Sequence, residues 1–321
     1  MKAVSWQFEK PFFRQLLPKS NLSKEGKQLR FRSKIVGFGA VLALAGLALS
    51  PNASAATQPS KVLWAQYFDQ KAGTKVDPKI WTYDLGNGFG WGNNEQEYYT
   101  NKAANISMDG KGHLVITAKK LNPDDPRDQY ITNYCANCLY SSAKVVTRGK
   151  VGFKYGSMSA RMQIPEGVGM WPAFWMLGVP RSNCNGWPSC GEIDIMEARG
   201  SDVYHSVHSL HGNGYSGGSA LSHYYFSGND PLSTGYHIYR VDWLPNSIKF
   251  YVDGHFVGGE TKNTVKPNDW AFNGEFYLIL NLATGGNFDG GDLDETIQQA
   301  ELKIDWIRYS TLNGFGTLYK H

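Results

Sequence analysis

The sequence predicts an all-β fold of two packed antiparallel sheets, that is, a β-sandwich or jelly roll. Short runs rich in apolar, β-branched and aromatic residues recur along the chain, and turn residues separate them. Aromatic residues make up 14% of the chain and 36 residues are glycine, whereas helix signals are few. No repeat, low-complexity tract or linker divides the chain after residue 55. We therefore expect one all-β domain over residues 56–321.

The first 55 residues have the organisation of a cleaved export signal. Residues 1–34 contain nine Lys or Arg and two Glu, an uncharged stretch follows at 35–49, and Ala53-Ser54-Ala55 provides small residues for the peptidase. The uncharged stretch is short for a membrane span. We expect a secreted protein with no membrane contact after cleavage. The long basic segment leaves an uncleaved anchor as the alternative.

The basic charge of the chain resides in this signal. The net charge is +4 for the full sequence and about −3 once residues 1–55 are removed. The remaining chain therefore offers no basic patch for nucleic acid, which argues against that class of partner. It is long enough to bury a sizeable core, and we expect it to be a monomer.

The predicted strands follow one another between turn signals. Pro165-Glu166-Gly167 ends one strand, residues 244–247 form a turn, and Asp253-Gly254 makes a tight hairpin. A helix is expected only around residues 293–299. The predicted strands are residues 114–118, 157–164, 191–197, 236–243, 248–252, 255–257, 276–282 and 302–309.

The four cysteines are predicted to form two local disulfides. An even count in an exported chain favours disulfides, and the natural pairs are Cys135 with Cys138 and Cys184 with Cys190. The Cys-x-x-Cys spacing of the first pair also occurs in redox and zinc sites. However, no helical pattern follows it, and the second pair does not have the spacing of zinc ligands.

The most informative segment is residues 191–197, which read GEIDIME. On a strand, Glu192 and Asp194 share one face, whereas Glu197 is out of phase by one residue. A β-bulge near residues 195–196 returns Glu197 to the face of the other two carboxylates. Three like charges on one strand face cost stability, which favours a functional role. The alternative is a solvated acidic face.

Two carboxylic acids that flank a bond, with aromatics nearby, are typical of glycoside hydrolysis. A retaining mechanism needs an ionised nucleophile and a protonated acid, with the carboxyl groups about 5–5.5 Å apart. Glu192 and Glu197 can reach this separation if both lean inward from a concave strand. Asp194 between them would raise the pKa of one glutamate by like-charge repulsion.

Further segments resemble glycoside hydrolase family 16, and its laminarinase (endo-β-1,3-glucanase) branch most closely. The resemblance extends from about residue 64 to residue 309, which is nearly the whole chain after the signal. The E-x-D-x-x-E core in this setting is highly specific. The matching segments are residues 90–95, 154–161, 169–177, 191–197, 211–212, 251–254, 281–286 and 304–309.

This resemblance implies a jelly roll of two curved antiparallel sheets with a concave substrate cleft. It also implies a retaining reaction in which Glu192 is the nucleophile, Asp194 the supporting carboxylate and Glu197 the acid/base. The extra residue at Met196 matches the bulged form of the motif that laminarinases share, whereas lichenases typically carry E-x-D-x-E. This favours β-1,3-glucan as substrate, although agarases and carrageenases also carry the bulge.

The resemblance also points to residues that bind the polysaccharide. Trp171 and Trp175 share a strand face by parity, and indole rings stack on the C–H faces of sugars; core packing is the alternative. For Arg161 a surface salt bridge is the alternative, and His211 is expected to lie near Glu197. The predicted substrate-binding residues are Trp91, Asn93, Asn94, Arg161, Trp171, Trp175, His211 and Asn281.

Catalysis is expected to require no cofactor, but the family often carries a structural calcium, held partly by the residue that matches Asp305. Here Gln66-Tyr67-Phe68 replaces the usual Asp-Glu-Phe, so only backbone carbonyls could serve as ligands there. The predicted function is a secreted retaining endo-β-1,3-glucanase. The alternatives are a mixed-linkage glucanase, an agarase, a transglycosylase and a non-catalytic glucan-binding protein, and the last is disfavoured because both glutamates are present. The charge near −3 argues mildly against sulfated polymers.

Overall fold

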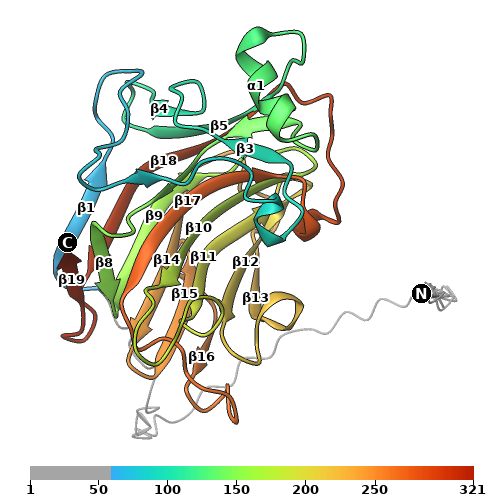
Figure 1. Ribbon diagram of the computed structural model, residues 1–321. Helices are drawn as coiled ribbons and strands as arrows, with labels where there is room; N and C mark the ends of the chain where they lie inside the picture. Colours follow the sequence, from blue (N-terminus) through green and yellow to red (C-terminus); the bar gives the residue numbers. More distant parts are fainter. Residues whose placement is uncertain (1–58) are drawn as a thin grey trace, which may run out of the picture. The chain divides into compact units, whose positions relative to one another are not determined.

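The computed structural model describes residues 59–321, and the export signal predicted for residues 1–55 lies outside that part. The described residues form two large β-sheets that contain nearly all of their regular structure (Figure 1). Strand pairing is antiparallel except between two short strands. The predicted all-β class with two antiparallel sheets is therefore confirmed. Within the described residues, no helix is long and apolar enough to cross a membrane.

The first sheet has ten strands. Its strands are β1 (Val62–Tyr67), β3 (Glu97–Tyr99), β4 (Ile106–Met108), β5 (Leu114–Lys120), β6 (Tyr140–Ser142), β9 (Gly156–Gln163), β14 (His237–Leu244), β15 (Ser247–Val252), β16 (His255–Thr261) and β18 (Gln299–Ser310). Their order is β16-β15-β14-β9-β18-β5-β6-β3, with β1 beside β18 and β4 beside β5.

The second sheet has nine strands and carries the acidic segment. Its strands are β2 (Thr82–Tyr83), β7 (Lys144–Val146), β8 (Val151–Lys154), β10 (Met170–Gly178), β11 (Glu192–Arg199), β12 (Asp202–His211), β13 (Leu221–Phe226), β17 (Phe276–Thr284) and β19 (Thr317–Lys320). Their order is β13-β12-β11-β10-β17-β7-β2, and β8 lies between β17 and β19. In Figure 1, β17, β10, β11, β12 and β13 curve side by side across the molecule.

The apolar core lies between the two sheets. On β10, Phe174 and Met176 face the core, whereas Trp171 and Trp175 alternate with them and face away. Met158 of β9 enters the same core from the ten-stranded sheet. Burial of a large apolar side chain contributes about 1.5–3 kcal/mol. This alternation fixes which face of each strand is left for function.

The one α-helix of the described residues is not where the sequence predicted it. Helix α1 spans Pro126–Tyr134, whereas residues 293–299 form turns and the start of β18. Asp125 caps α1, because its side chain accepts a hydrogen bond from the backbone N–H of Arg127 at 2.9 Å. Proline in the first turn suits this start. The prediction missed the cap because α1 is nearly polar all round and has no apolar stripe.

Both predicted disulfides are confirmed. Cys135 is bonded to Cys138 at the end of α1, and Cys184 is bonded to Cys190 in the loop before β11. No free cysteine is found in the described part of the chain. Each bridge stabilises a loop rather than joining the two sheets. The remaining short elements are 3₁₀ turns, namely η1 (Gly90–Gly92), η2 (Gly217–Ser219) and η3 (Asn287–Asp289).

Candidate active site

The predicted bulge in β11 is confirmed, and it interrupts the pairing with both neighbouring strands. Along β12, Ser209 pairs with Asp194 and Val207 pairs with Glu197, so three steps on β11 match two steps on β12. Pairing with β10 shifts at the same place, between residues 174 and 175. The extra residue returns Glu197 to the outer face of the sheet.

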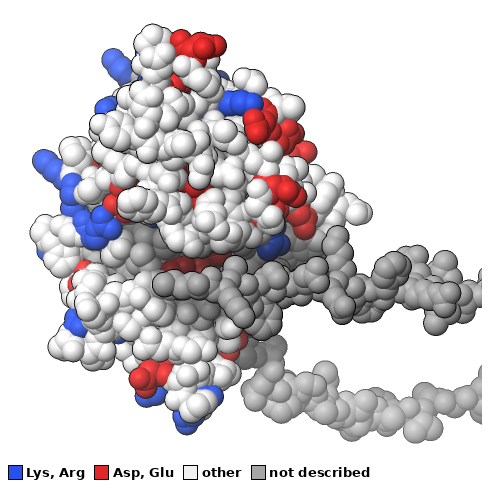
Figure 2. Space-filling view, turned by 45° about the vertical axis from the view of Figure 1, so that its right-hand side comes forward, with Lys and Arg blue, Asp and Glu red and all other residues white. Residues whose placement is uncertain are grey.

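Glu192, Asp194 and Glu197 therefore share the face that points away from the core. Ile193, between the first two, is fully buried in the core. Figure 2 shows a hollow between an upper and a lower rim of the molecule, with acidic side chains at its bottom. The three carboxylates form a candidate catalytic site on a curved sheet, as the resemblance implied.

The three carboxyl groups have raised pKa values because they are buried together. Burial raises the pKa of Glu197 to about 7, and the negative charge of Glu192 adds to this effect. Burial and then repulsion from Asp194 raise the pKa of Glu192. Burial and then the charge of Glu197 raise the pKa of Asp194. Three like charges this close do not all ionise together, so the cluster retains a proton near neutral pH.

His211 contacts two of the three carboxylates, Asp194 and Glu192. Its Nε2 lies 2.9 Å from Oδ2 of Asp194 and 3.7 Å from Oε1 of Glu192. The backbone N–H of Gly217 donates to its Nδ1 at 3.2 Å, so in the neutral ring the proton lies on Nε2 and faces the carboxylates. The sequence predicted that His211 lies near Glu197, whereas the structure places it beside Asp194 and Glu192, because it pairs with Glu192 across β11 and β12.

Trp171 holds the other glutamate. Its indole N–H donates a hydrogen bond to Oε1 of Glu197 at 3.0 Å. The indole stacks on Phe288 of η3 with ring centroids 4.8 Å apart and planes 19° from parallel. Arg199 also packs on the Phe288 ring, and its guanidinium carbon lies 4.3 Å from the ring centroid. Trp171 thus fixes Glu197 and stabilises its charged form.

Trp175 also faces outward, and buried polar groups orient it. Its indole N–H donates to Oδ1 of Asn281 at 2.7 Å, and the Asn281 amide donates to the hydroxyl of Tyr99 at 3.0 Å. Asn281 is buried and both ends of its amide are used in this way. The structure therefore places Asn281 as a support for Trp175, although the sequence predicted a residue that contacts sugar.

Lys144 lies between two of the predicted aromatic residues, and the sequence gave no signal for it. Its Nζ is 4.3 Å from the ring centroid of Trp91 and 5.0 Å from that of Trp175. Cations are attracted to the faces of aromatic rings. Burial lowers the pKa of Lys144, and the charges of Glu95 and Asp84 oppose this shift. A lysine on a short strand is normally predicted to lie on the surface. Only the tertiary structure shows that Lys144 lies between Trp91 and Trp175.

The Gly-rich loop before β3 carries Trp91, Asn93 and Asn94 to the same end of the sheet. Asn93 donates to Glu95 at 3.1 Å, and Asn94 donates to Asn287 at 2.9 Å. The Asn93 carbonyl accepts the backbone N–H of Asn287, which joins this loop to η3. Asn93 and Asn94 are exposed, whereas Trp91 packs against Lys144 and Tyr99.

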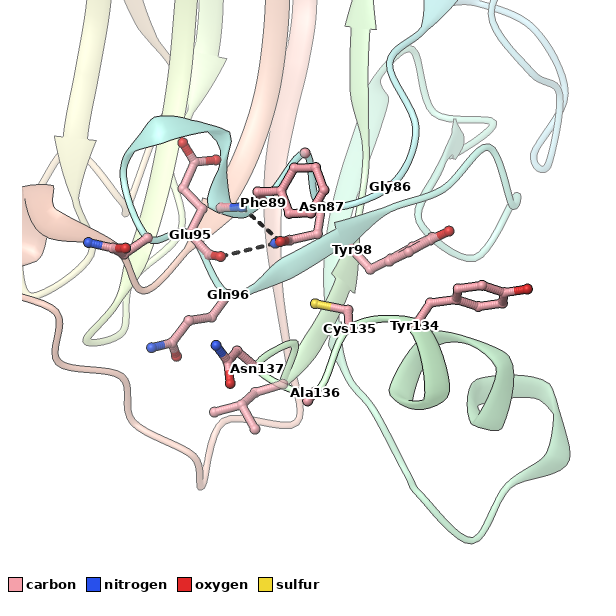
Figure 3. A pocket seen from close by; sticks show the side chains of 14 residues that line it. Gly86, Asn87, Phe89, Glu95, Gln96, Tyr98, Tyr134, Cys135, Ala136 and Asn137 are labelled. Carbon is pink, nitrogen blue, oxygen red and sulfur yellow. Dashed lines mark hydrogen bonds between the residues drawn. The ribbon is translucent and has the colours of Figure 1, made fainter.

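Asn87 fixes the shape of this loop. Its amide donates to the carbonyl of Glu95 and accepts the backbone N–H of Gly90 (Figure 3). It also donates to the carbonyl of Glu97. Gly88 is required because a Cβ there would lie 2.8 Å from the Trp91 ring, at a backbone φ of +56°. A cavity of about 840 Å³ lies on the side of the loop that faces residues 134–139.

Arg161 does not belong to this site, so its predicted role in substrate binding is wrong. It projects from β9 of the ten-stranded sheet, on the face opposite to the core residues Ala160 and Met162. Its guanidinium pairs with Asp305 at 2.5 Å and lies over the ring of Tyr236. The alternative that the sequence left open for Arg161, a salt bridge, is the one that the structure shows.

The same ion pair bears on the possible calcium site. The Asp305 carboxylate forms an ion pair with the Arg161 guanidinium. Its negative charge is therefore already balanced and is not free for a calcium ion. Asp305 therefore fits an ion pair and not a calcium ligand, and calcium has no part in the chemistry derived below. The only cluster of three or more acidic, His or Cys ligands in residues 59–321 is Glu192, Asp194 and His211, which belongs to the catalytic site.

Trp187 is a further aromatic residue that the sequence reasoning missed. It lies in the loop closed by the Cys184–Cys190 disulfide, and its ring centroid is 6.4 Å from that of His211. The ring is largely exposed. A Trp-Pro pair directly before the carboxylate strand was the available signal. The disulfide thus positions an aromatic side chain beside His211, which contacts Glu192.

Comparisons with known proteins agree with this geometry. The family described as glycosyl hydrolases family 16 matches residues 91–308. Glucan endo-1,3-beta-glucosidase A1 of Niallia circulans is 36% identical over 270 residues, covering 77% of this chain and 37% of that protein. Beta-glucanase of Rhodothermus marinus is 34% identical over 266 residues, covering 77% of this chain and 84% of that protein.

A solved structure gives the same result. The laminarinase catalytic domain of Thermotoga maritima MSB8 superposes with a TM-score of 0.69 at 37% identity, covering 79% of this chain and 99% of that domain. The chain spans only 37% of the length of the Niallia protein, but it matches a whole catalytic domain. The family match includes the bulged strand and the residues that support it. The chain therefore belongs to glycosyl hydrolases family 16.

Proposed function

We propose that this protein is a secreted, retaining endo-β-1,3-glucanase that hydrolyses laminarin-type glucans. The observation that carries the proposal is the bulged strand β11, which presents two glutamates and an aspartate on one outer sheet face. The raised pKa of Glu197, about 7, suits a general acid at mildly acidic pH. The relatives, a glucan endo-1,3-beta-glucosidase and a laminarinase, support β-1,3-glucan as the substrate class.

In the first step, Glu192 attacks the anomeric carbon while Glu197 donates its proton to the glycosidic oxygen. The carbon–oxygen bond breaks, the leaving sugar chain departs with that proton, and a covalent glycosyl–Glu192 ester remains. In the second step, the Glu197 carboxylate takes a proton from water, and the water oxygen attacks the anomeric carbon. Glu192 leaves as a carboxylate, and the configuration of the sugar is retained.

Asp194 and His211 position the nucleophile rather than react. The Nε2–H of His211 faces Asp194 and Glu192, so it favours the charged form of Glu192 that attack requires. Trp171 orients the carboxyl group of Glu197 in both of its protonation states. Two carboxyl groups suffice for this chemistry, so we expect unchanged rates after treatment with EDTA.

The direct test is hydrolysis of laminarin, measured by released reducing ends. We expect Glu197→Gln to lower kcat by about 10²- to 10⁴-fold, the usual contribution of an acid–base group. Glu192→Gln should lower kcat at least as much, because it removes the nucleophile that forms the covalent intermediate. Glu192→Gln protein that releases as much sugar as wild type would contradict the assignment. Arg161→Gln is the matched control, because this residue lies on the other sheet.

Azide separates the two glutamate roles. On an aryl β-glucoside substrate whose leaving group departs without an acid, Glu197→Ala protein still forms the glycosyl–enzyme, and azide attacks it without help from a base. We therefore expect restored turnover and a glycosyl azide of retained configuration. In Glu192→Ala protein, no glycosyl–enzyme forms, and we expect no such product. The same retained azide from both variants would contradict the assigned roles.

Secretion and a monomeric state are also part of the proposal. Two disulfides within the described residues are expected of an exported chain, because reducing compartments keep thiols free. Analysis of the culture medium for a chain that begins near residue 56 tests export, and size-exclusion chromatography with light scattering tests the monomer. A full-length chain held in the membrane would instead support the uncleaved anchor.

A further inference from the structure

A row of six residues crosses the nine-stranded sheet at right angles to the strands. Each member pairs directly with the next in the strand register. Directly opposed residues in antiparallel strands project to the same face. The row consists of Lys144 of β7, Asn281 of β17, Ala173 of β10, Glu197 of β11, Val207 of β12 and Tyr224 of β13. Tyr224 therefore projects to the same face as the acid/base glutamate.

The contacts of the neighbouring residue confirm this orientation. His223 precedes Tyr224 and pairs with His208, and both imidazole rings lie about 6 Å from the ring of Phe250 in the ten-stranded sheet. His208 is fully buried. The His223 side of β13 thus faces the core, so Tyr224 and Phe226 face the cleft side.

Tyr224 and Phe226 are unusually exposed for aromatic residues on a strand. Their exposed fractions are 62% and 60%. Phe226 stacks on His205 of β12 with centroids 4.8 Å apart, which holds its ring in place. Within residues 59–321, the Tyr224 side chain makes no hydrogen bond or aromatic contact that would explain its position. Exposed aromatic surface of this kind marks a binding site more often than isolated apolar residues do.

The surface between Glu197 and Tyr224 continues the catalytic cleft. Val207 lies between them in the row, and it is buried although it does not belong to the core between the sheets. Two strand spacings separate Tyr224 from Glu197, which is about 10 Å. This is too far for the sugar whose bond is cleaved, but it suits a sugar further along the same chain.

We propose that Tyr224 and Phe226 form a distal subsite that binds the glucan on the β13 side of the cleaved bond. The inference rests on the proposed glucanase function. Sugar rings present apolar C–H faces that stack on aromatic rings, and such contacts need no charge. At the opposite end of the row, Lys144 lies beside the rings of Trp91 and Trp175, so aromatic side chains flank Glu197 on both sides.

The test is the dependence of KM on substrate length. We compare wild type with the double variant Tyr224→Ala/Phe226→Ala on β-1,3-linked oligosaccharides of increasing length and on laminarin. We expect KM for the long substrates to rise about 3- to 10-fold, the factor that loss of aromatic stacking implies, with kcat unchanged. The shortest oligosaccharide that is cleaved does not reach β13, so its kcat/KM should equal that of wild type.

Phe256→Ala is the matched control, since Phe256 is also 60% exposed but lies on β16 of the ten-stranded sheet. It should behave as wild type on every substrate. The conservative variant Tyr224→Trp should retain the low KM, because it keeps an aromatic face. Far-UV circular dichroism and melting temperature show that each variant is folded.

Three outcomes overturn the proposal. The first is an unchanged KM for laminarin in the folded double variant. The second is an equal loss on the shortest and the longest substrates, and the third is an equal effect of Phe256→Ala. Failure of the glucanase function itself looks different, because wild type would then release no sugar from any of these substrates.

Discussion

At the residue scale, the protonation of Glu197 sets the upper pH limit of the proposed reaction. The residue must carry a proton to act as the acid, and burial with the charge of Glu192 raises its pKa to about 7. The value of kcat/KM should therefore fall about tenfold per pH unit above about pH 7. The Trp171 N–H lowers this pKa because it stabilises the carboxylate.

Removal of the hydrogen bond from Trp171 to Glu197 should shift the alkaline limb of the pH profile of kcat/KM in a known direction. We expect Trp171→Phe to shift the fall in kcat/KM to higher pH. Trp175→Phe is the control, because its indole donates to Asn281 and not to Glu197. A pH–rate profile on laminarin for the three proteins decides the matter. An alkaline limb that stays in place in Trp171→Phe would contradict the assignment of Glu197 as the titrating acid.

The same shift predicts how stability depends on pH. Glu197 titrates near 4.5 in the unfolded chain and near 7 in the folded protein, so the folded state binds more protons between these values. Wild type should therefore lose stability relative to Glu197→Gln as the pH rises from 4.5 to 7. The change in the difference between their free energies of unfolding is at most about 3 kcal/mol above pH 7, and it is smaller if water reaches the carboxylate. Urea unfolding at pH 4 and pH 8 measures it, and a gain for Glu197→Gln at pH 4 alone would contradict it.

At the element scale, the bulge in β11 is an insertion of one residue that both neighbouring strands accommodate at the same point. Deletion of Met196 should therefore restore regular pairing on both sides and leave Glu197 on the cleft face. It also removes a fully buried side chain, which costs about 2–5 kcal/mol. Insertion of an alanine after Met196 also puts Glu197 in phase with Asp194 in a regular strand, but it moves Glu197 one residue pair further from Glu192, which should abolish hydrolysis.

Melting temperature and laminarin hydrolysis distinguish these two variants. The deletion should be folded, destabilised and active, whereas the insertion should be inactive. An inactive but fully folded deletion variant would show that the bulge itself, and not only the face it provides, is needed for catalysis. Equal activity of both variants would contradict the requirement for a fixed spacing between Glu192 and Glu197 along the strand.

The two disulfides should differ in their effect on activity. Replacement of Cys184 and Cys190 by serine frees the loop that holds Trp187 beside His211, so KM for laminarin should rise. Replacement of Cys135 and Cys138 should leave KM unchanged, because that bridge lies at the end of α1. Each pair closes a short loop and contributes about 2 kcal/mol to stability. Equal KM values for both double variants would contradict a role of the Cys184–Cys190 loop in substrate binding.

The sequence predicted most of what local periodicity determines. Period-two alternation predicted the faces of Glu192, Asp194, Trp171 and Trp175, and the phase of Glu197 predicted the bulge. It could not predict which strands become neighbours, so it could not show that Arg161 lies on the ten-stranded sheet, away from the acidic strand. Contacts such as Trp175 with Asn281 join residues 106 positions apart, and no local pattern encodes them.

At the scale of the whole molecule, charge predicts which polysaccharides the cleft accepts. Residues 56–321 carry a net charge of about −3, and the floor of the site holds three carboxylates. Two cations near the site are already engaged, because Lys144 lies between aromatic rings and Arg199 covers Phe288. A sulfated chain would thus meet like charge without free cations to offset it.

We therefore expect hydrolysis of laminarin and curdlan, and none of carrageenan, in a side-by-side digestion. Agarose is neutral, so charge does not exclude it, and the same digestion tests it. Lichenan tests the mixed-linkage alternative, and its cleavage at the rate of laminarin would broaden the proposed specificity. Because the preferred substrate is neutral, a rise from 0.05 to 0.5 M NaCl should change kcat/KM on laminarin by less than about twofold. Cleavage of carrageenan, or a strong dependence of kcat/KM on salt, would contradict the assignment of a neutral glucan as substrate. Either result would mean that cationic groups elsewhere in the cleft recognise the substrate.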